Sequence, residues 1–156
     1  MSTRRQCGTC ALCCKLFYVK ELSKPMDTWC QHCRPGRGGC TIYSDRPAQC
    51  RDFACLWLDQ RQLAEPLGDE WFPPRCKMVL QPWAEDRLIV VVDPAFPNAW
   101  RQEPYYSILR SVAAQGKHVQ MRVGRRFIGL HADGSEEEIW RSQAQMEGRA
   151  EDADKP

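Results

Sequence analysis

Nine of the ten cysteines in this 156-residue chain lie within one third of the sequence, between residues 7 and 55. They are Cys7, Cys10, Cys13, Cys14, Cys30, Cys33, Cys40, Cys50 and Cys55. Close cysteine spacings recur here where a core-forming segment would instead show apolar periodicity. We therefore expect thiols to organise this part of the chain and its chemistry to lie there.

The cellular compartment decides whether these thiols form disulfides or stay reduced. No apolar stretch of the secretory-signal kind follows Met1, and the longest apolar run, 88–92, has the length and β-branching of a buried strand. The sequence therefore predicts a cytoplasmic protein without a membrane span. Cytosolic thiols stay reduced unless they bind metal or turn over in redox chemistry, so the spacing favours metal over structural disulfides or inert buried thiols.

The spacing also limits the kind of metal site. Cys7-x2-Cys10-x2-Cys13 is the spacing that wraps a [4Fe–4S] cluster in bacterial ferredoxins, but the fourth cysteine here is the adjacent Cys14, followed by Lys15 rather than Pro. Neighbouring cysteines direct their side chains differently, and nine thiolates exceed one tetrahedral site. Two centres, or one polynuclear centre, are expected. Cysteine ligands suit both iron and zinc.

Three segments carry a resemblance to a known family. They are Cys7-Gly-Thr-Cys10-Ala-Leu-Cys13-Cys14, Cys30-Gln-His-Cys33 and Cys40-Thr-Ile-Tyr43-Ser-Asp-Arg46-Pro47-Ala-Gln-Cys50-Arg51-Asp-Phe53-Ala-Cys55. They resemble the CxxCxxCC family, also called YkgJ-type cysteine cluster proteins, described as zinc- or iron-chelating and often as iron–sulfur proteins. The segment after residue 55 resembles a bacterial subgroup with no assigned activity.

The resemblance implies a set of metal ligands. The cysteines that match the recurrent positions of the family are Cys7, Cys10, Cys13, Cys14, Cys30, Cys40 and Cys50. Cys33 stands where many members have an apolar residue, and Cys55 matches only a subgroup.

For several other residues near the cysteines, the sequence allows both a role at the metal site and a purely structural role. Arg51 is a candidate to hydrogen-bond a carboxylate or a backbone carbonyl beside the cluster. Tyr43 and Phe53 are candidates to shield the sulfur atoms from water. The alternative for all three is ordinary packing. His32 is a candidate nitrogen ligand, although the middle residues of a Cys-x-x-Cys turn usually point away. Cys76 reads as a small buried side chain rather than a nucleophile.

The predicted fold class is α+β. An irregular cysteine-rich metal-binding region, 1–76, precedes a small antiparallel sheet with one covering helix, 77–134. An acidic tail, 135–156, follows, with at most a helix from about Trp140. In the first region we predict a loop at 35–39 and a helix from about Ser44 to Leu58. The elements predicted in the second region are strands 77–80, 87–92, 118–123 and 127–130, and a helix at 104–115.

Enzyme motifs are not evident. The sequence has no Gly-rich phosphate loop, no Gly-x-Ser-x-Gly elbow and no His-Glu-x-x-His helix, so enzyme activity stays an open question. Asp93, Arg101 and Glu103 lie near turns where a site could form, although surface charge explains them equally well. His118 and His131 read as ordinary strand residues. Thiolates offset the arginines, and nucleic acid is not an expected partner.

The leading hypothesis is a metal-binding protein with an iron–sulfur or an iron or zinc centre, which acts in electron transfer, sensing or metal handling. Its partners would be metal ions and a protein redox or docking partner. The alternative is a structural zinc module in which residues 77–134 recognise another protein. A third hypothesis is a subunit of a redox enzyme.

Overall fold

The computed structural model describes residues 5–35, 37, 39–81 and 84–146. The α-helices are α1 (Leu12–Leu16), α2 (Ala48–Asp52), α3 (Pro73–Cys76), α4 (Tyr105–Ala114) and α5 (Gln143–Met146). The short 3-10 helices are η1 (Lys20–Leu22), η2 (Tyr43–Asp45), η3 (Asp69–Trp71) and η4 (Ala99–Arg101). The strands are β1 (Met78–Leu80), β2 (Arg87–Val92), β3 (His118–Val123), β4 (Arg126–Leu130) and β5 (Glu136–Trp140). The α+β class is confirmed.

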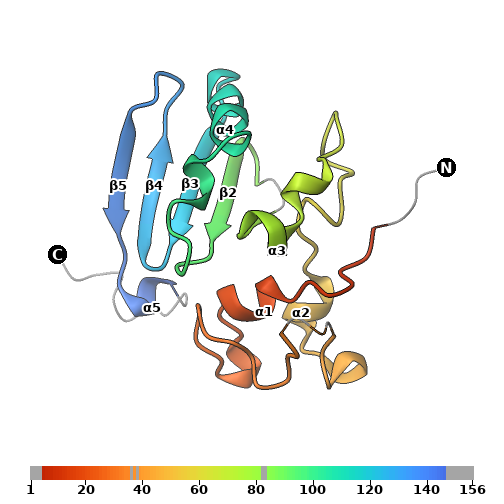
Figure 1. Ribbon diagram of the computed structural model, residues 1–156. Helices are drawn as coiled ribbons and strands as arrows, with labels where there is room; N and C mark the ends of the chain where they lie inside the picture. The colour runs from red at the N-terminus through yellow and green to blue at the C-terminus, as the bar shows by residue number, and fades with distance from the viewer. Residues whose placement is uncertain (1–4, 36, 38, 82–83, 147–156) are drawn as a thin grey trace.

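The five strands form one sheet in the order β1-β2-β3-β4-β5 (Figure 1). The prediction of an antiparallel sheet is wrong at one pair, because β2 and β3 run parallel, with Val90 opposite Met121. Helix α4 lies between them in the chain, and a strand that follows a helical crossover re-enters the sheet in the same direction. The other three pairs are antiparallel.

Strand alternation gives the sheet two buried faces. One face carries Leu88, Val90 and Val92 of β2 into the main core, where α4 and Trp71 also pack. On the opposite face, Val79 of β1 and Val91 of β2 pack against α1. The helix that carries Cys13 and Cys14 therefore lies directly on the sheet, and Figure 1 shows the remaining cysteine-rich segments gathered beyond it.

Two predictions about local structure need correction. The helix predicted from Ser44 to Leu58 is only the five residues of α2, because Phe53 adopts an extended conformation and its ring packs on Phe17 at a centroid distance of 4.9 Å. The segment from 135 was predicted as a tail, but β5 pairs with β4 along its whole length. The acidic residues Glu136, Glu137 and Glu138 therefore belong to a strand of the sheet rather than to a tail.

Some predictions fall on residues outside those that the structure describes. These are the end of the acidic tail, 147–156, parts of the loop at 35–39 and two residues, 82–83, of the connection before β2. Within the described ranges, no helix combines the length and the apolar character needed to cross a membrane.

Candidate metal centre

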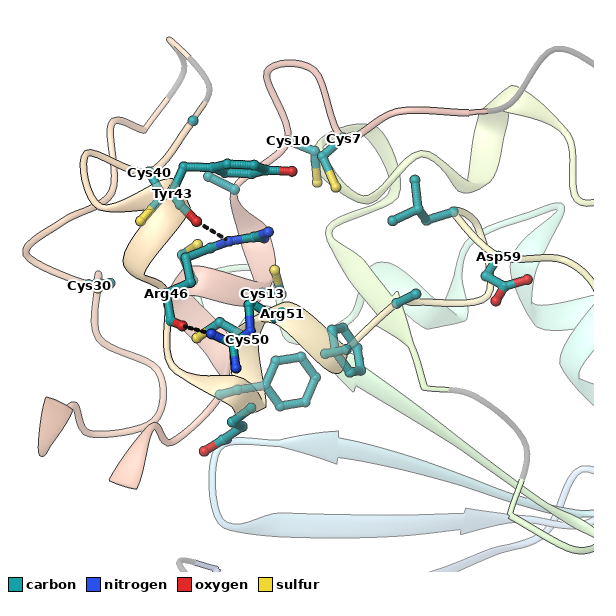
Figure 2. Close-up of a pocket in the computed structure, with 18 of the residues that line it drawn as sticks. Cys7, Cys10, Cys13, Cys30, Cys40, Tyr43, Arg46, Cys50, Arg51 and Asp59 are labelled. Carbon is teal, nitrogen blue, oxygen red and sulfur yellow. Dashed lines mark hydrogen bonds between the residues drawn. The ribbon is translucent and has the colours of Figure 1, made fainter. Parts of the chain in front are cut away.

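Seven of the nine clustered cysteines line one open cavity of about 1730 Å³ (Figure 2). They are Cys7, Cys10, Cys13, Cys14, Cys30, Cys40 and Cys50. These are the same seven that the sequence resemblance implies as ligands. Cys33 and Cys55 do not line the cavity but lie beside cysteines that do. None of the ten cysteines forms a disulfide.

Short turns and very short helices place these cysteines. The Cys10 amide donates to the Cys7 carbonyl, with 2.7 Å between nitrogen and oxygen, so the first Cys-x-x-Cys closes as a tight turn. Cys13 and Cys14 follow on α1, and Cys50 is carried by α2. Tight turns of this kind bring side chains with close sequence spacing to one side of the chain.

Two buried cations fix the end of α1 just after the paired cysteines. Lys24 is 6% exposed, and its ammonium donates to the carbonyls of Lys15 and Phe17 at 2.8 and 2.6 Å. Arg122 of β3 donates to the Leu16 carbonyl at 2.7 Å. A short helix leaves its last carbonyls without intrahelical partners, and these side chains supply them. The position of Cys14 is thereby tied to the sheet.

A second link joins α1 to the sheet. The Lys15 ammonium lies 2.7 Å from a carboxylate oxygen of Asp93, which is 5% exposed. The reading of Asp93 as surface charge is therefore wrong, since it is buried at the end of β2. Neither Lys15 nor Lys24 belongs to a periodic pattern in the sequence, although a lysine directly after Cys14 is a detectable hint of a charge partner.

Crowding of the thiols shifts their pKa values. Burial, and to a smaller extent the neighbouring cysteines, raise the pKa of both Cys10 and Cys33 to about 12. A hydrogen bond from the Cys13 thiol and another from Cys33, together with nearby Lys24, lower the pKa of Cys14 to about 6. Cys14 therefore loses its proton more readily than Cys10 and Cys33, which stay protonated at neutral pH.

Arg46 and Arg51 are among the residues that line the cavity. Arg46 donates to the Tyr43 carbonyl at 2.9 Å and stacks 3.7 Å from the centre of the Tyr43 ring (Figure 2). Arg51 donates to the Arg46 carbonyl at 3.2 Å, which is the backbone alternative predicted for it. Tyr43 is 63% exposed, so it supports Arg46 rather than burying sulfur. Phe53 and Cys55 both pack against the apolar cluster between α1 and the sheet.

The donor set fits a thiolate-bound metal in chemistry and number. Cysteines far apart in sequence surround one cavity that also has Lys24 and Arg46 in its wall, and such cations offset the charge of metal thiolates. Within the described part of the chain, no three donor side chains stand close enough to form a finished metal site. Metal binding would therefore draw the sulfurs together, and folding of this region would accompany it.

The remaining candidates lie away from the cavity. His32 has its ring 3.3 Å from the Gln31 amide and does not line the cavity. His118 and His131 are exposed, beside Asp86 and Glu137. Cys76 is 2% exposed, and burial raises its pKa to about 12, which confirms the prediction of a buried small side chain.

Arg101 and Glu103 also have structural partners. Arg101 forms an ion pair with Glu136 of β5 at 2.7 Å. Glu103 accepts from the Ser107 hydroxyl at 2.8 Å, in the first turn of α4. The Arg101 contact is made to the edge strand of the sheet, and the Glu103 contact is made to the start of α4.

Comparisons with known proteins give no match: no family model, no curated protein and no solved structure is similar to this chain. The resemblance to the CxxCxxCC family therefore stays a prediction that rests on the cysteine spacing.

Proposed function

We propose that the chain is a metal-binding protein whose clustered cysteines hold an iron–sulfur centre, with a role in electron transfer, sensing or metal handling. The observation that carries this proposal is the gathering of seven cysteines from separate segments around one open cavity. Reduced thiols that converge in this way, without a disulfide among them, are typical of a metal site.

Zinc is the second candidate, and one observation favours it. Among the described residues from 5 to 55 the buried apolar side chains are few: Ala11, Leu12, Leu16, Val19, Met26 and Pro47. A region with so small a core needs another source of stability, and structural zinc supplies it in many small domains. In this alternative the α+β region would be the part that recognises another protein.

Metal analysis distinguishes the two candidates. We expect protein purified without oxygen to contain iron and acid-labile sulfide in matching amounts, with broad visible absorption. Stoichiometric zinc in a colourless protein would support the structural alternative. The Cys76→Ala variant is the matched control, because it removes a buried thiol outside the cavity and should keep the metal. A folded protein that binds neither metal would contradict both candidates.

The affinity for zinc is expected to rise with pH. The raised pKa values of Cys10 and Cys33 mean that both carry protons at neutral pH, and a metal must displace those protons to bind. Each such thiol increases the apparent affinity ~10-fold per pH unit, whereas Cys14, with its pKa of about 6, adds little above neutral pH. Competition with a chromophoric chelator between about pH 7 and pH 9 measures the slope. A pH-independent affinity would show that the bound thiols are already ionised.

A further inference from the structure

Two histidines stand opposite each other on neighbouring strands of the sheet. Strands β3 and β4 pair with Val119 opposite Leu130, so the next pair outward is His118 and His131. Directly opposed residues of an antiparallel pair point to the same face of a sheet. Both histidines accordingly line one small pocket of about 130 Å³, which lies outside the cysteine cavity.

Backbone hydrogen bonds bring these two side chains into the closest kind of pairing. The His118 amide donates to the Asp86 carbonyl at 2.8 Å, on the β2 side of its strand. The His131 amide donates to the Ser135 carbonyl at 2.9 Å, on the β5 side. The two amides therefore point away from each other, and such a non-hydrogen-bonded pair has its Cα atoms about 4.5 Å apart. Two imidazoles at this spacing can reach one ion.

Strand β5 adds a carboxylate on the same face. Glu137 lies opposite Gly129, two positions before His131, and strand alternation gives residues two apart the same face. The Glu137 carboxylate is 3.6 Å from Nε2 of His131, and Glu137 also lines the pocket. Imidazole nitrogens and carboxylate oxygens are zinc ligands, and two histidines with one glutamate make a zinc site that leaves a position open.

The wall of the pocket includes a glycine that the backbone does not require. Gly129 lies within β4 and does not have a positive φ. An added Cβ would meet only atoms of Glu137, at 3.8 Å, which is ordinary van der Waals contact. Glycine inside a strand weakens it and often marks a place where a ligand approaches closely. The missing side chain leaves the space between Glu137 and the two histidines open.

We propose that His118, His131 and Glu137 bind a divalent transition-metal ion, and that zinc is the ion that suits these donors. The side chains of the two histidines are 69% and 50% exposed, so they can rotate to meet an ion. That rotation is needed, because within the described ranges no three donors yet converge on one point. Lys117 also lines the pocket, and the carboxylates of Glu137 and Asp86 offset its charge.

The proposed histidine site is separate from the cysteines. Strand β2 runs toward α1 and β3 is parallel to it, so His118, at the start of β3, lies at the end away from α1 (Figure 1). Arg122, which contacts the end of α1, is four positions further along β3, a distance of about 13 Å. The site uses no thiol and does not depend on the proposed function.

Imidazole NMR signals test the site, because the chain has only three histidines. The full chain, freed of metal and kept reduced, is titrated with Zn²⁺ alone, and the ring signals of His32, His118 and His131 are followed. His32 lies between Cys30 and Cys33, so it reports the zinc that the cysteines take up. We expect His118 and His131 to shift together at micromolar zinc, as one further equivalent binds.

Substitutions identify the donors. His118→Gln and Glu137→Gln should each raise the Kd for the zinc-dependent shift of His131 more than about 10-fold, since even an outer partner of a ligand can be worth that much. Glu138→Gln is the matched control, because Glu138 is the next residue of β5 and alternation places it on the other face of the sheet. This variant should keep the wild-type affinity.

Shifts of the two histidines at different zinc concentrations would overturn the shared site, and shifts that need millimolar zinc would show adventitious binding only. An unchanged affinity in His118→Gln would contradict the site equally. If a variant unfolds, the joint shift in the wild-type chain decides. Failure of the proposed function looks different, because His32 would then show no response to zinc while His118 and His131 would still shift together.

Discussion

A fragment that covers only residues 77–140 is expected not to fold, although it keeps all five strands and α4. Removing the N-terminal part exposes Val79 and Val91, which Leu16 now covers, and takes the buried Trp71 out of the main core. Truncation of a single large core side chain costs about 2–5 kcal/mol. Loss of several such side chains exceeds the stability of a typical domain, which is about 5–15 kcal/mol.

The fragment also loses partners for buried charges. Asp93 and Arg122 are 5% and 6% exposed, and their partners Lys15 and Asp27 lie in the removed part. Amide proton dispersion in an NMR spectrum and cooperative thermal unfolding measure the outcome, with a chain ending at residue 146 as the folded control. A dispersed spectrum for the fragment would instead support the alternative in which residues 77–134 act as an independent recognition module.

Replacing Arg122 by methionine is expected to cost about 3–5 kcal/mol in the free energy of unfolding. The Arg122 guanidinium lies 3.2 Å from a carboxylate oxygen of Asp27 and donates to the carbonyls of Leu16 and Gly124. Burial raises the pKa of Asp27 while Arg122 lowers it, so removing the arginine leaves a partly buried carboxyl without its counter-charge. The Leu16 carbonyl then loses the Arg122 donor and keeps its bond from the Asp27 amide.

Urea unfolding of the full chain measures this cost, provided that the slope of the transition is unchanged. Arg87→Met is the matched control, since Arg87 is exposed at the start of β2 and should change stability by less than about 0.5 kcal/mol. Adding Asp27→Asn to Arg122→Met should recover part of the loss, because both charges are then absent. Equal losses for the Arg122 and Arg87 variants would contradict the proposed role of the pair.

Much of the sheet could be predicted because its strands carry their own local signals. The apolar run 87–92 and the alternation at 118–123 gave β2 and β3 with the bounds that the structure has. Their parallel pairing was missed, although the long connection with a predicted helix is itself a sign of a crossover. Arg122 is one of the polar positions in that alternation, but it is buried because α1 and Asp27 cover its face of the sheet.

The candidate site was predictable in its residues but not in its arrangement. Close cysteine spacing predicts a cluster of thiols, seven of which line one cavity, and the Cys-x-x-Cys spacing correctly places Cys7 beside Cys10. Which distant cysteines meet depends on tertiary packing, such as that of Cys55 against the cluster around Leu16. The supporting cation Lys24 has no pattern in the sequence, because its role comes from carbonyls that only the folded chain brings together.

Strand β5 has a consequence for the behaviour of the protein at high concentration. Among the residues that the structure describes it is the last strand of the sheet, and an edge strand of this kind can offer its outer backbone groups to another chain. Glu136, Glu137 and Glu138 are exposed along it. A second copy arriving edge to edge would bring like charges together, and such repulsion opposes strand addition. The acidic run thus protects the open edge of the sheet against aggregation.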